Sequence, residues 1–214
     1  MDRRMRVGVV ADTHVGEFLP RLPPEVLELM EGADLILHAG DVADPSVLEE
    51  LREVAPVVAV KGNHDRGPGL DHLPRDIVVR VGGARIGLTH GSRAAAVELP
   101  AIAWSVAGGR PRLLGFHGHM RRRFRDVDIV VVGHLHMPIR RMVRGALVFS
   151  PGSVYSAEHD PRFRWSGPRR AAYRRYRSGL APEARAPAVG MIEVGPSGVQ
   201  ARAIPLRRPI VERR

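Results

Sequence analysis

Residues 6–14 read RVGVVADTH, a short apolar run followed directly by Asp12, Thr13 and His14. Runs of this length that are rich in Val and Ile and end at Gly, Asp or Pro are typical of β-strands. The pattern recurs along the chain, at residues 34–39, 56–60, 77–81, 84–89 and 128–132. Residues 6–14 therefore predict a buried strand that ends in a polar, chemistry-bearing turn.

Helical patterns lie between the first three of these strands. Residues 24–31 begin with prolines suited to a first helical turn, and residues 46–54 start with Ser46 and carry Glu49 three positions later, a capping-box pattern. Strand, helix, strand, helix, strand predicts an α/β fold with a parallel sheet.

The pattern changes after residue 91. Residues 94–107 and 110–125 look helical, residues 140–150 read as a hairpin, and two more strands are expected at 189–194 and 199–204. Residues 155–188 are rich in Pro, Arg and Ala and show no clear period. We expect one domain over residues 1–214 with mixed sheets and an Arg-rich insertion at about 155–188.

Composition narrows the chemistry. The 214 residues include no cysteine, so any metal ion must be held by His, Asp, Glu or Asn. The aliphatic runs are far too short to cross a bilayer, so no membrane partner is expected. The N-terminal residues lack the apolar core of a signal peptide, which predicts a cytoplasmic protein.

Charge is distributed unevenly along the chain. The formal net charge is +10, but residues 1–110 carry 12 basic and 16 acidic side chains, whereas residues 111–214 carry 21 and 7. Such a basic half could attract nucleic acid or another polyanion, or its arginines could simply be solvated. Charge alone does not choose between these interpretations.

Polar residues follow five of the predicted strands, where open α/β sheets place their ligands. Alone, Gly40-Asp41 would be ordinary turn chemistry, whereas the Asn63 and His134 motifs alone would leave a turn and a ligand pair equally open. Together and in this order they predict a metal site. The five motifs are Asp12-Thr13-His14, Gly40-Asp41, Gly62-Asn63-His64-Asp65, Thr89-His90-Gly91 and Gly133-His134-Leu135-His136.

This set of motifs resembles the calcineurin-like metallophosphoesterase superfamily, over residues 6–153. The turn Ser150-Pro151-Gly152-Ser153 is similar to that of the small single-domain bacterial and archaeal phosphodiesterases of the superfamily. The resemblance implies a sandwich of two mixed β-sheets flanked by helices. It also implies a phosphoric ester hydrolase, most simply a phosphodiesterase acting by in-line attack of a metal-bridging hydroxide.

The resemblance implies two divalent metal ions. One would be held by Asp12, His14, Asp41 and His136, and the other by Asp41, Asn63, His90 and His134. Sharing the Asp41 carboxylate is physically coherent, because an anionic bridge offsets the repulsion between two dications. Nitrogen and oxygen ligands suit Mn²⁺, the ion we expect, with Fe, Zn²⁺ and Ni²⁺ as alternatives.

His64 and Asp65 are the predicted catalytic residues. The resemblance assigns His64 to the leaving group, as a proton donor or charge stabiliser. Asp65 is expected to orient the His64 ring through its other nitrogen. His38 is expected to pack in a strand end, His117 and His119 to lie at the surface or substrate rim, and His72 and His159 to be solvated.

Several alternatives stay open. The GDxVDRG motif of protein phosphatases and dinucleoside tetraphosphate hydrolases is absent, because Asp44 is followed by Pro45 and Ser46. A scaffold of the same fold is a second function class, although every ligand position is intact here. A nuclease or nucleotide phosphatase is a third. Its substrate would meet the arginines and aromatic rings of residues 162–177, whose simpler interpretation is a solvated loop or a homo-oligomer contact.

Overall fold

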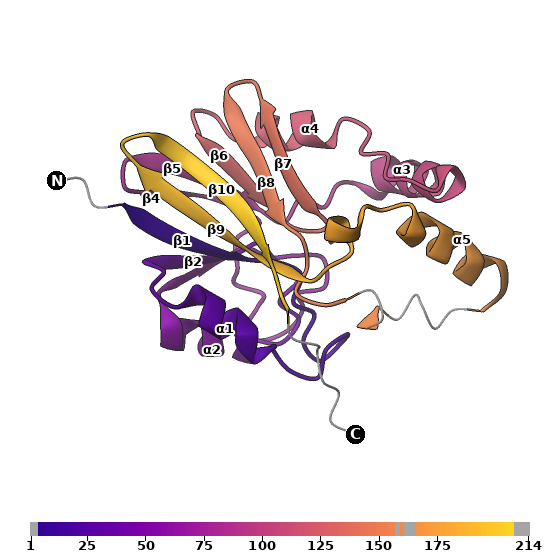
Figure 1. The fold of residues 1–214 in the computed structure, drawn as a ribbon, viewed down its shortest axis with the longest axis horizontal. Helices are drawn as coiled ribbons and strands as arrows, with labels where there is room; N and C mark the ends of the chain where they lie inside the picture. Colours follow the sequence, from indigo (N-terminus) through magenta and orange to yellow (C-terminus); the bar gives the residue numbers. More distant parts are fainter. Residues whose placement is uncertain (1–3, 157–158, 161–165, 208–214) are drawn as a thin grey trace.

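The chain forms two five-stranded β-sheets with helices on their outer faces (Figure 1). The computed structural model describes residues 4–156, 159–160 and 166–207. The resemblance predicted this architecture of two mixed sheets, and the strand order confirms it.

The first sheet has the strand order β10-β9-β1-β2-β3. Strands β1, β2 and β3 are parallel, as the strand–helix–strand pattern predicted, whereas β9 is antiparallel to β1 and to β10. The strands span Met5–Val10 (β1), Leu35–His38 (β2), Val57–Ala59 (β3), Ala188–Gly195 (β9) and Gly198–Pro205 (β10).

The second sheet has the order β4-β5-β6-β8-β7. Its central strands β5, β6 and β8 are parallel, and the predicted hairpin forms the antiparallel pair β7–β8. The strands span Asp76–Val81 (β4), Ala84–Thr89 (β5), Ile129–Val132 (β6), Pro138–Val143 (β7) and Ala146–Pro151 (β8).

Apolar side chains fill the space between the sheets. Val9 and Leu37 of the first sheet share a fully buried cluster with Leu88 and Val131 of the second. Helices α1 (Pro24–Met30) and α2 (Ser46–Val54) pack against the other face of the first sheet, and α4 (Phe116–Arg123) covers the second. The core therefore holds the carboxyl ends of β1, β2, β3, β5 and β6 in fixed positions.

Two local predictions were wrong in detail. Helix α2 does not use a Ser46–Glu49 capping box, because Asp44 Oδ1 accepts the Ser46 N–H instead (2.9 Å). Of the helix expected at 110–125, only Phe116–Arg123 is α-helical.

The Arg-rich stretch contains a helix that its sequence did not reveal. Helix α5 spans Gly167–Ser178 and is followed by the short 3₁₀ helix η3, Pro182–Ala184. Helix α5 packs against α3, which spans Ala95–Gly108. None of the helices described is long and apolar enough to cross a membrane.

Candidate metal centre

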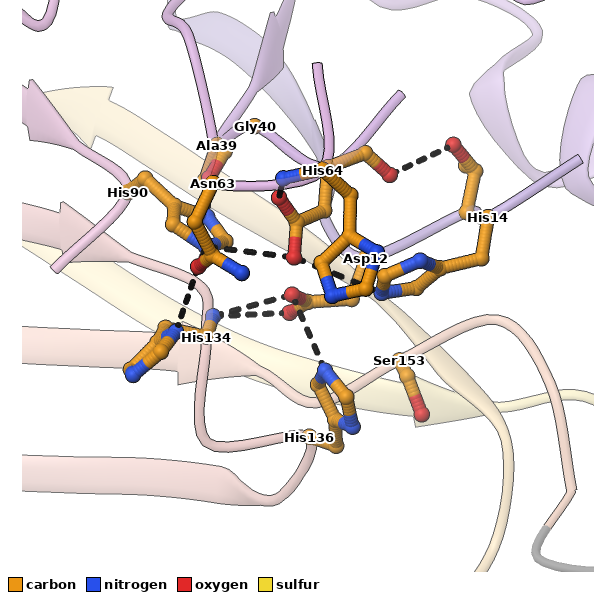
Figure 2. A network of polar contacts seen from close by, with 12 residues as sticks. Asp12, His14, Ala39, Gly40, Asn63, His64, His90, His134, His136 and Ser153 are labelled. Carbon is orange, nitrogen blue, oxygen red and sulfur yellow. Dashed lines mark hydrogen bonds and ion pairs between the residues drawn. The ribbon is translucent and has the colours of Figure 1, made fainter. Parts of the chain in front are cut away.

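The strand-end motifs converge on one site (Figure 2). Backbone hydrogen bonds tie the turns together: the Asp12 N–H donates to Gly40 O (3.0 Å), and the His14 N–H donates to Asp41 O (3.1 Å). The Asp12 carboxylate accepts the backbone N–H of His134 at 3.0 Å, across 122 positions of sequence. Hydrogen bonds thus link the turns of both sheets into one polar site.

Several residues of these turns have an unusual backbone conformation. In the described part of the chain, nine non-glycine residues have a positive φ, a conformation that is uncommon for L-residues. Such conformations persist where the surrounding structure over-determines them, and they cluster at functional sites. Five of the nine are predicted metal ligands, namely Asp12, His14, Asp41, His134 and His136.

Four predicted ligands form the first cluster. Ligand atoms of Asp12, His14, Asp41 and His136 all lie within 4.8 Å of one another. His14 Nε2 is 3.4 Å from Asp41 Oδ2, and His136 Nε2 is 3.4 Å from Asp12 Oδ1. The structure therefore brings together the whole ligand set that the resemblance assigned to one metal ion.

The second predicted set lies on the other side of Asp41. His90 Nε2 is 3.3 Å from Asp41 Oδ2. Asn63 Oδ1 accepts hydrogen bonds from His90 Nε2 (2.9 Å) and from His134 Nδ1 (3.0 Å). Figure 2 shows Asp12 between the two groups of histidines. Asp41 contacts histidines of both sets, as a bridging carboxylate must.

The chemistry of these groups fits divalent ions. His14 Nε2 is buried, faces Asp41 and has no hydrogen-bond partner. An unpartnered buried nitrogen is costly unless it serves a purpose such as ligation. The backbone also packs closely against Asp41. A Cβ atom at position 62 would lie 2.1 Å from Asp41 Oδ1, so only glycine fits there.

Electrostatics keeps the carboxylates ionised. Burial opposes the charge of Asp12 and Asp41, but neighbouring histidines outweigh it and hold the pKa of both carboxyl groups below the ordinary value. Burial also opposes the charge of His90, yet the hydrogen bond with Asp41 and the nearby carboxylates raise the pKa of His90 to about 9. A divalent ion would compete with the proton for this nitrogen.

Glu17 is a site residue that the sequence reasoning missed. One oxygen, Oε2, accepts hydrogen bonds from His14 Nδ1 (2.9 Å) and from His64 Nδ1 (2.8 Å). The carboxylate thereby leaves the Nε2 atoms of both rings directed away from it. An available signal was its position three residues after His14, in a turn rather than a helix.

Two further residues form hydrogen bonds with predicted histidine ligands. Glu98 Oε1 of α3 accepts from His134 Nε2 (2.8 Å), while the Tyr155 hydroxyl is hydrogen-bonded to His136 Nδ1. Ligating histidines commonly use their second nitrogen in this way, and the partner fixes the tautomer and orientation of the ring. Neither residue carried a motif that could have revealed this contact.

The role expected for Asp65 requires correction. Its carboxylate accepts the backbone N–H groups of Asp41 (3.0 Å), Ala43 (2.9 Å) and Gly62 (2.7 Å), and it is 1% exposed. Glu17, not Asp65, contacts the His64 ring. Asp65 therefore joins the turns after β2 and β3, because three converging backbone donors bind both of its oxygens.

His64 differs from the predicted ligands in its exposure. Its side chain is 38% exposed, compared with 0% for His14, 2% for His90, 17% for His134 and 14% for His136. Its backbone N–H donates to Asp41 Oδ1 (2.8 Å), which fixes its place beside the site. The His64 ring is therefore more exposed than the ring of any predicted histidine ligand.

The remaining histidines belong to neither predicted ligand set. His38 is fully buried at the end of β2, as expected, and its ring contacts Thr13 Oγ1 (3.2 Å). Burial lowers the pKa of His38 to about 4. His117 lines an open pocket of about 740 Å³ with Arg141 and Arg144, and His72 is exposed.

The Arg-rich stretch gives a mixed outcome. Arg162, Arg164 and Trp165 lie outside the described residues. Tyr173 is 6% exposed and its hydroxyl donates to Asp160, so this ring is not available to stack on a base. The interleaved arginines and aromatic rings that suggested nucleic-acid binding are therefore not all on the surface.

Comparison with known proteins agrees with this geometry. A family model for the calcineurin-like phosphoesterase superfamily domain matches residues 5–165. The chain belongs to this superfamily. A probable metallophosphoesterase of Methanothermobacter thermautotrophicus is 32% identical over 149 residues, which cover 70% of this chain and 77% of the relative. Membership of a family of metal-dependent phosphoesterases is thus established.

Two solved structures share the fold of this superfamily member. Vacuolar protein sorting 29 of Cryptosporidium parvum superposes with a TM-score of 0.62 and 20% identity, covering 97% of this chain and 100% of that chain. A novel archaeal phosphodiesterase superposes with a TM-score of 0.56 and 20% identity, covering 94% and 100%. At this identity the likeness shows a common fold.

Proposed function

We propose that this superfamily member is a phosphodiesterase that works with two divalent metal ions. The observation that carries the proposal is the convergence of seven predicted ligands, from five strand ends, around the shared carboxylate of Asp41. A structural role alone does not require two groups of histidines on opposite sides of one buried aspartate.

Asp12, His14, Asp41 and His136 would hold one ion, and Asp41, Asn63, His90 and His134 the other. The nitrogen and oxygen donors favour Mn²⁺, with Fe, Zn²⁺ and Ni²⁺ as alternatives. When bound, a pair of such ions supplies Lewis acidity toward phosphate oxygens and makes a water nucleophile available near neutral pH.

His64 would act on the leaving group. Its Nδ1 donates to Glu17 (2.8 Å), so its Nε2 is the atom left to face a substrate. From this position the ring could give a proton to the departing oxygen. His64 would be a catalytic residue, and Glu17 a positioning residue that acts through it.

Preference for diesters rests on two features. The turn after Asp41 lacks the arginine that the GDxVDRG phosphatases place there, which disfavours their functions. The Ser150-Pro151-Gly152-Ser153 turn resembles that of the single-domain phosphodiesterase group, and the archaeal phosphodiesterase noted above has the same fold. We propose a cytoplasmic location for the enzyme and a nucleotide or nucleic acid as one candidate substrate.

Metal loading and a substrate screen test this function. Chelator-treated protein is reloaded with Mn²⁺, Fe²⁺, Zn²⁺ or Ni²⁺, the ions per chain are counted, and hydrolysis is measured on chromogenic mono- and diesters, cyclic nucleotides and short oligonucleotides. We expect two ions per chain and faster turnover of diesters than of monoesters. Faster monoester turnover would contradict the diester preference.

A non-catalytic scaffold is the competing function. The likeness to vacuolar protein sorting 29 brings it forward, but that likeness concerns the fold. The intact ligand set and the exposed His64 favour catalysis. Stoichiometric metal with no turnover of any phosphate ester would favour the scaffold instead.

A further inference from the structure

Helix α3 turns its polar side inward and leaves apolar side chains in solvent. Ala101 and Ser105 are buried, and Glu98 is 15% exposed. By contrast, Val97 is 45%, Leu99 64%, Ile102 55% and Trp104 50% exposed. These are four of the seven large hydrophobic side chains exposed in the part of the chain that the structure describes.

The inward side of α3 is fully engaged. Glu98 accepts from His134, and Ser105 Oγ donates to Ala101 O (2.7 Å) and accepts the Arg112 N–H (2.8 Å). The helix therefore cannot rotate to bury its apolar residues without breaking these bonds. A concentrated apolar surface of this kind marks an interaction site in a folded protein.

Positive charge lies beside this apolar surface. Helix α5, sequence GPRRAAYRRYRS, packs against α3 and contains five arginines and no acidic residue. Arg170, Arg174 and Arg175 are exposed. On α3 itself the only acidic residue is Glu98, which faces His134, and the Arg112 guanidinium lies 4.7 Å from the Trp104 ring centroid.

We propose that α3 and α5, together the α3–α5 lobe, dock on the surface of an anionic lipid bilayer. Exposed Leu, Ile and Trp on a protruding helix can enter the interfacial region of a bilayer, and flanking arginines attract anionic headgroups. Figure 1 shows the lobe at one end of the molecule, opposite β4. A bilayer suits a helix surface of this kind, because it requires no complementary pocket.

A second copy of the chain fits this surface less well. A twofold contact through α3 would bring the arginine-rich α5 helices of the two copies near each other, because the same patch is used on both sides. The sequence predicted no membrane partner because no segment can span a bilayer. Docking on the surface needs no spanning segment.

Vesicle binding tests the lobe directly. Full-length protein is mixed with vesicles of zwitterionic phosphatidylcholine alone, or of phosphatidylcholine with an equal share of phosphatidylglycerol, and the bound fraction is measured by flotation. We expect binding to the anionic vesicles, at least about tenfold weaker binding to the zwitterionic ones, and weakening by high salt. Absence of binding to anionic vesicles would overturn the proposal.

Matched variants locate the binding surface. The double substitution Leu99→Glu and Ile102→Glu should reduce binding at least about tenfold. Val78→Glu, an exposed apolar residue of β4 far from the lobe, is its control and should bind like wild type. Equal binding by the L99E/I102E protein would overturn the proposal.

A second variant and its control test the proposal even if the L99E/I102E protein does not fold. Arg170→Gln with Arg174→Gln should weaken binding to anionic vesicles about fivefold or more, whereas Arg80→Gln with Arg202→Gln, on β4 and β10, should not. All four proteins should keep their hydrolysis of a small diester. If wild type ignores vesicles but forms a dimer that L99E/I102E loses, α3 is a protein interface and the proposal is wrong.

Discussion

The two sides of the candidate site are supported by different carboxylates. On one side, Glu17 contacts both His14, a predicted metal ligand, and His64, the predicted leaving-group acid. On the other side, Glu98 contacts the predicted ligand His134 and the backbone N–H of Arg93, and within the described residues it contacts neither predicted catalytic residue. Asp41 lies between the sides and contacts His14 and His90.

This difference assigns different tasks to the two carboxylates. Glu98 can influence the reaction only through the orientation of a ligand. Glu17 can influence both the ligand and the proton donor, because a single oxygen binds both rings. We therefore expect the Glu17 side to link metal binding to leaving-group chemistry, and the Glu98 side to set metal affinity alone.

Loss of the Asp41 carboxylate should weaken metal binding on both sides of the site. Asp41→Asn should lower diester hydrolysis by more than about a thousandfold, because metal ions supply several kcal/mol of transition-state stabilisation. Metal analysis should show fewer ions per chain. Asp71→Asn, at an exposed carboxylate paired with Lys61, is the control and should change little. Retention of two ions and activity in D41N would refute the bridging role.

Removal of His64 should affect chemistry on the Glu17 side without loss of metal. His64→Ala should lose about a hundredfold or more of its activity on diesters with poor leaving groups and much less on good ones. Metal content should stay at the wild-type value. His72→Ala, at an exposed histidine, is the control. An equal loss on good and poor leaving groups would exclude the proton-donor role.

A pair of glutamine substitutions should separate the two sides. Glu98→Gln should weaken metal binding by about 10- to 100-fold and leave the dependence on the leaving group unchanged. Glu17→Gln should weaken metal binding by a similar factor and also steepen the leaving-group dependence. Titration with Mn²⁺ and rates for a series of diesters measure both effects, with the exposed Glu31→Gln as control.

The outcome for excess metal is decisive for Glu17. If saturating Mn²⁺ restores E17Q fully on every substrate, Glu17 acts only through His14 and the proposed link to His64 does not exist. Full restoration is expected for E98Q, since its effect should lie in affinity alone.

The smallest expected effect is on the pH dependence of protein stability, and it involves the buried side chain of His38. Burial lowers the pKa of His38 to about 4, so the folded protein keeps the ring neutral while the unfolded chain protonates it at its ordinary pKa. Stability should fall as pH drops from about 6.5 to about 4, by up to about 1.4 kcal/mol per pH unit from this group.

Urea unfolding of metal-free protein measures this slope. His38→Gln lacks the titrating ring, so the free energy of unfolding of wild type relative to H38Q should decrease across that interval as pH falls. His72→Gln should follow wild type. A constant difference between wild type and H38Q would show that His38 does not titrate as its burial requires.

Much of the fold was predictable because the information is local. The apolar run before Asp12 and the helical pattern of residues 46–54 follow from periodicity over a few residues. Helix α5 was missed because its sequence is dominated by arginine and offers no apolar stripe, so only its packing on α3 reveals it. The position of Asp65 was predicted, but its hydrogen-bond partners were not.

The sequence by itself predicted the seven ligand positions, because each lies in a turn after a strand and parallel strands bring such turns to one edge of their sheet. Only the tertiary structure decided how the site is supported. Glu98 meets His134 across 36 positions and His64 meets Glu17 across 47, distances over which no periodic pattern operates. The same limit applies to α3, because its sequence predicted a helix but only the packing shows which of its apolar side chains lie in solvent.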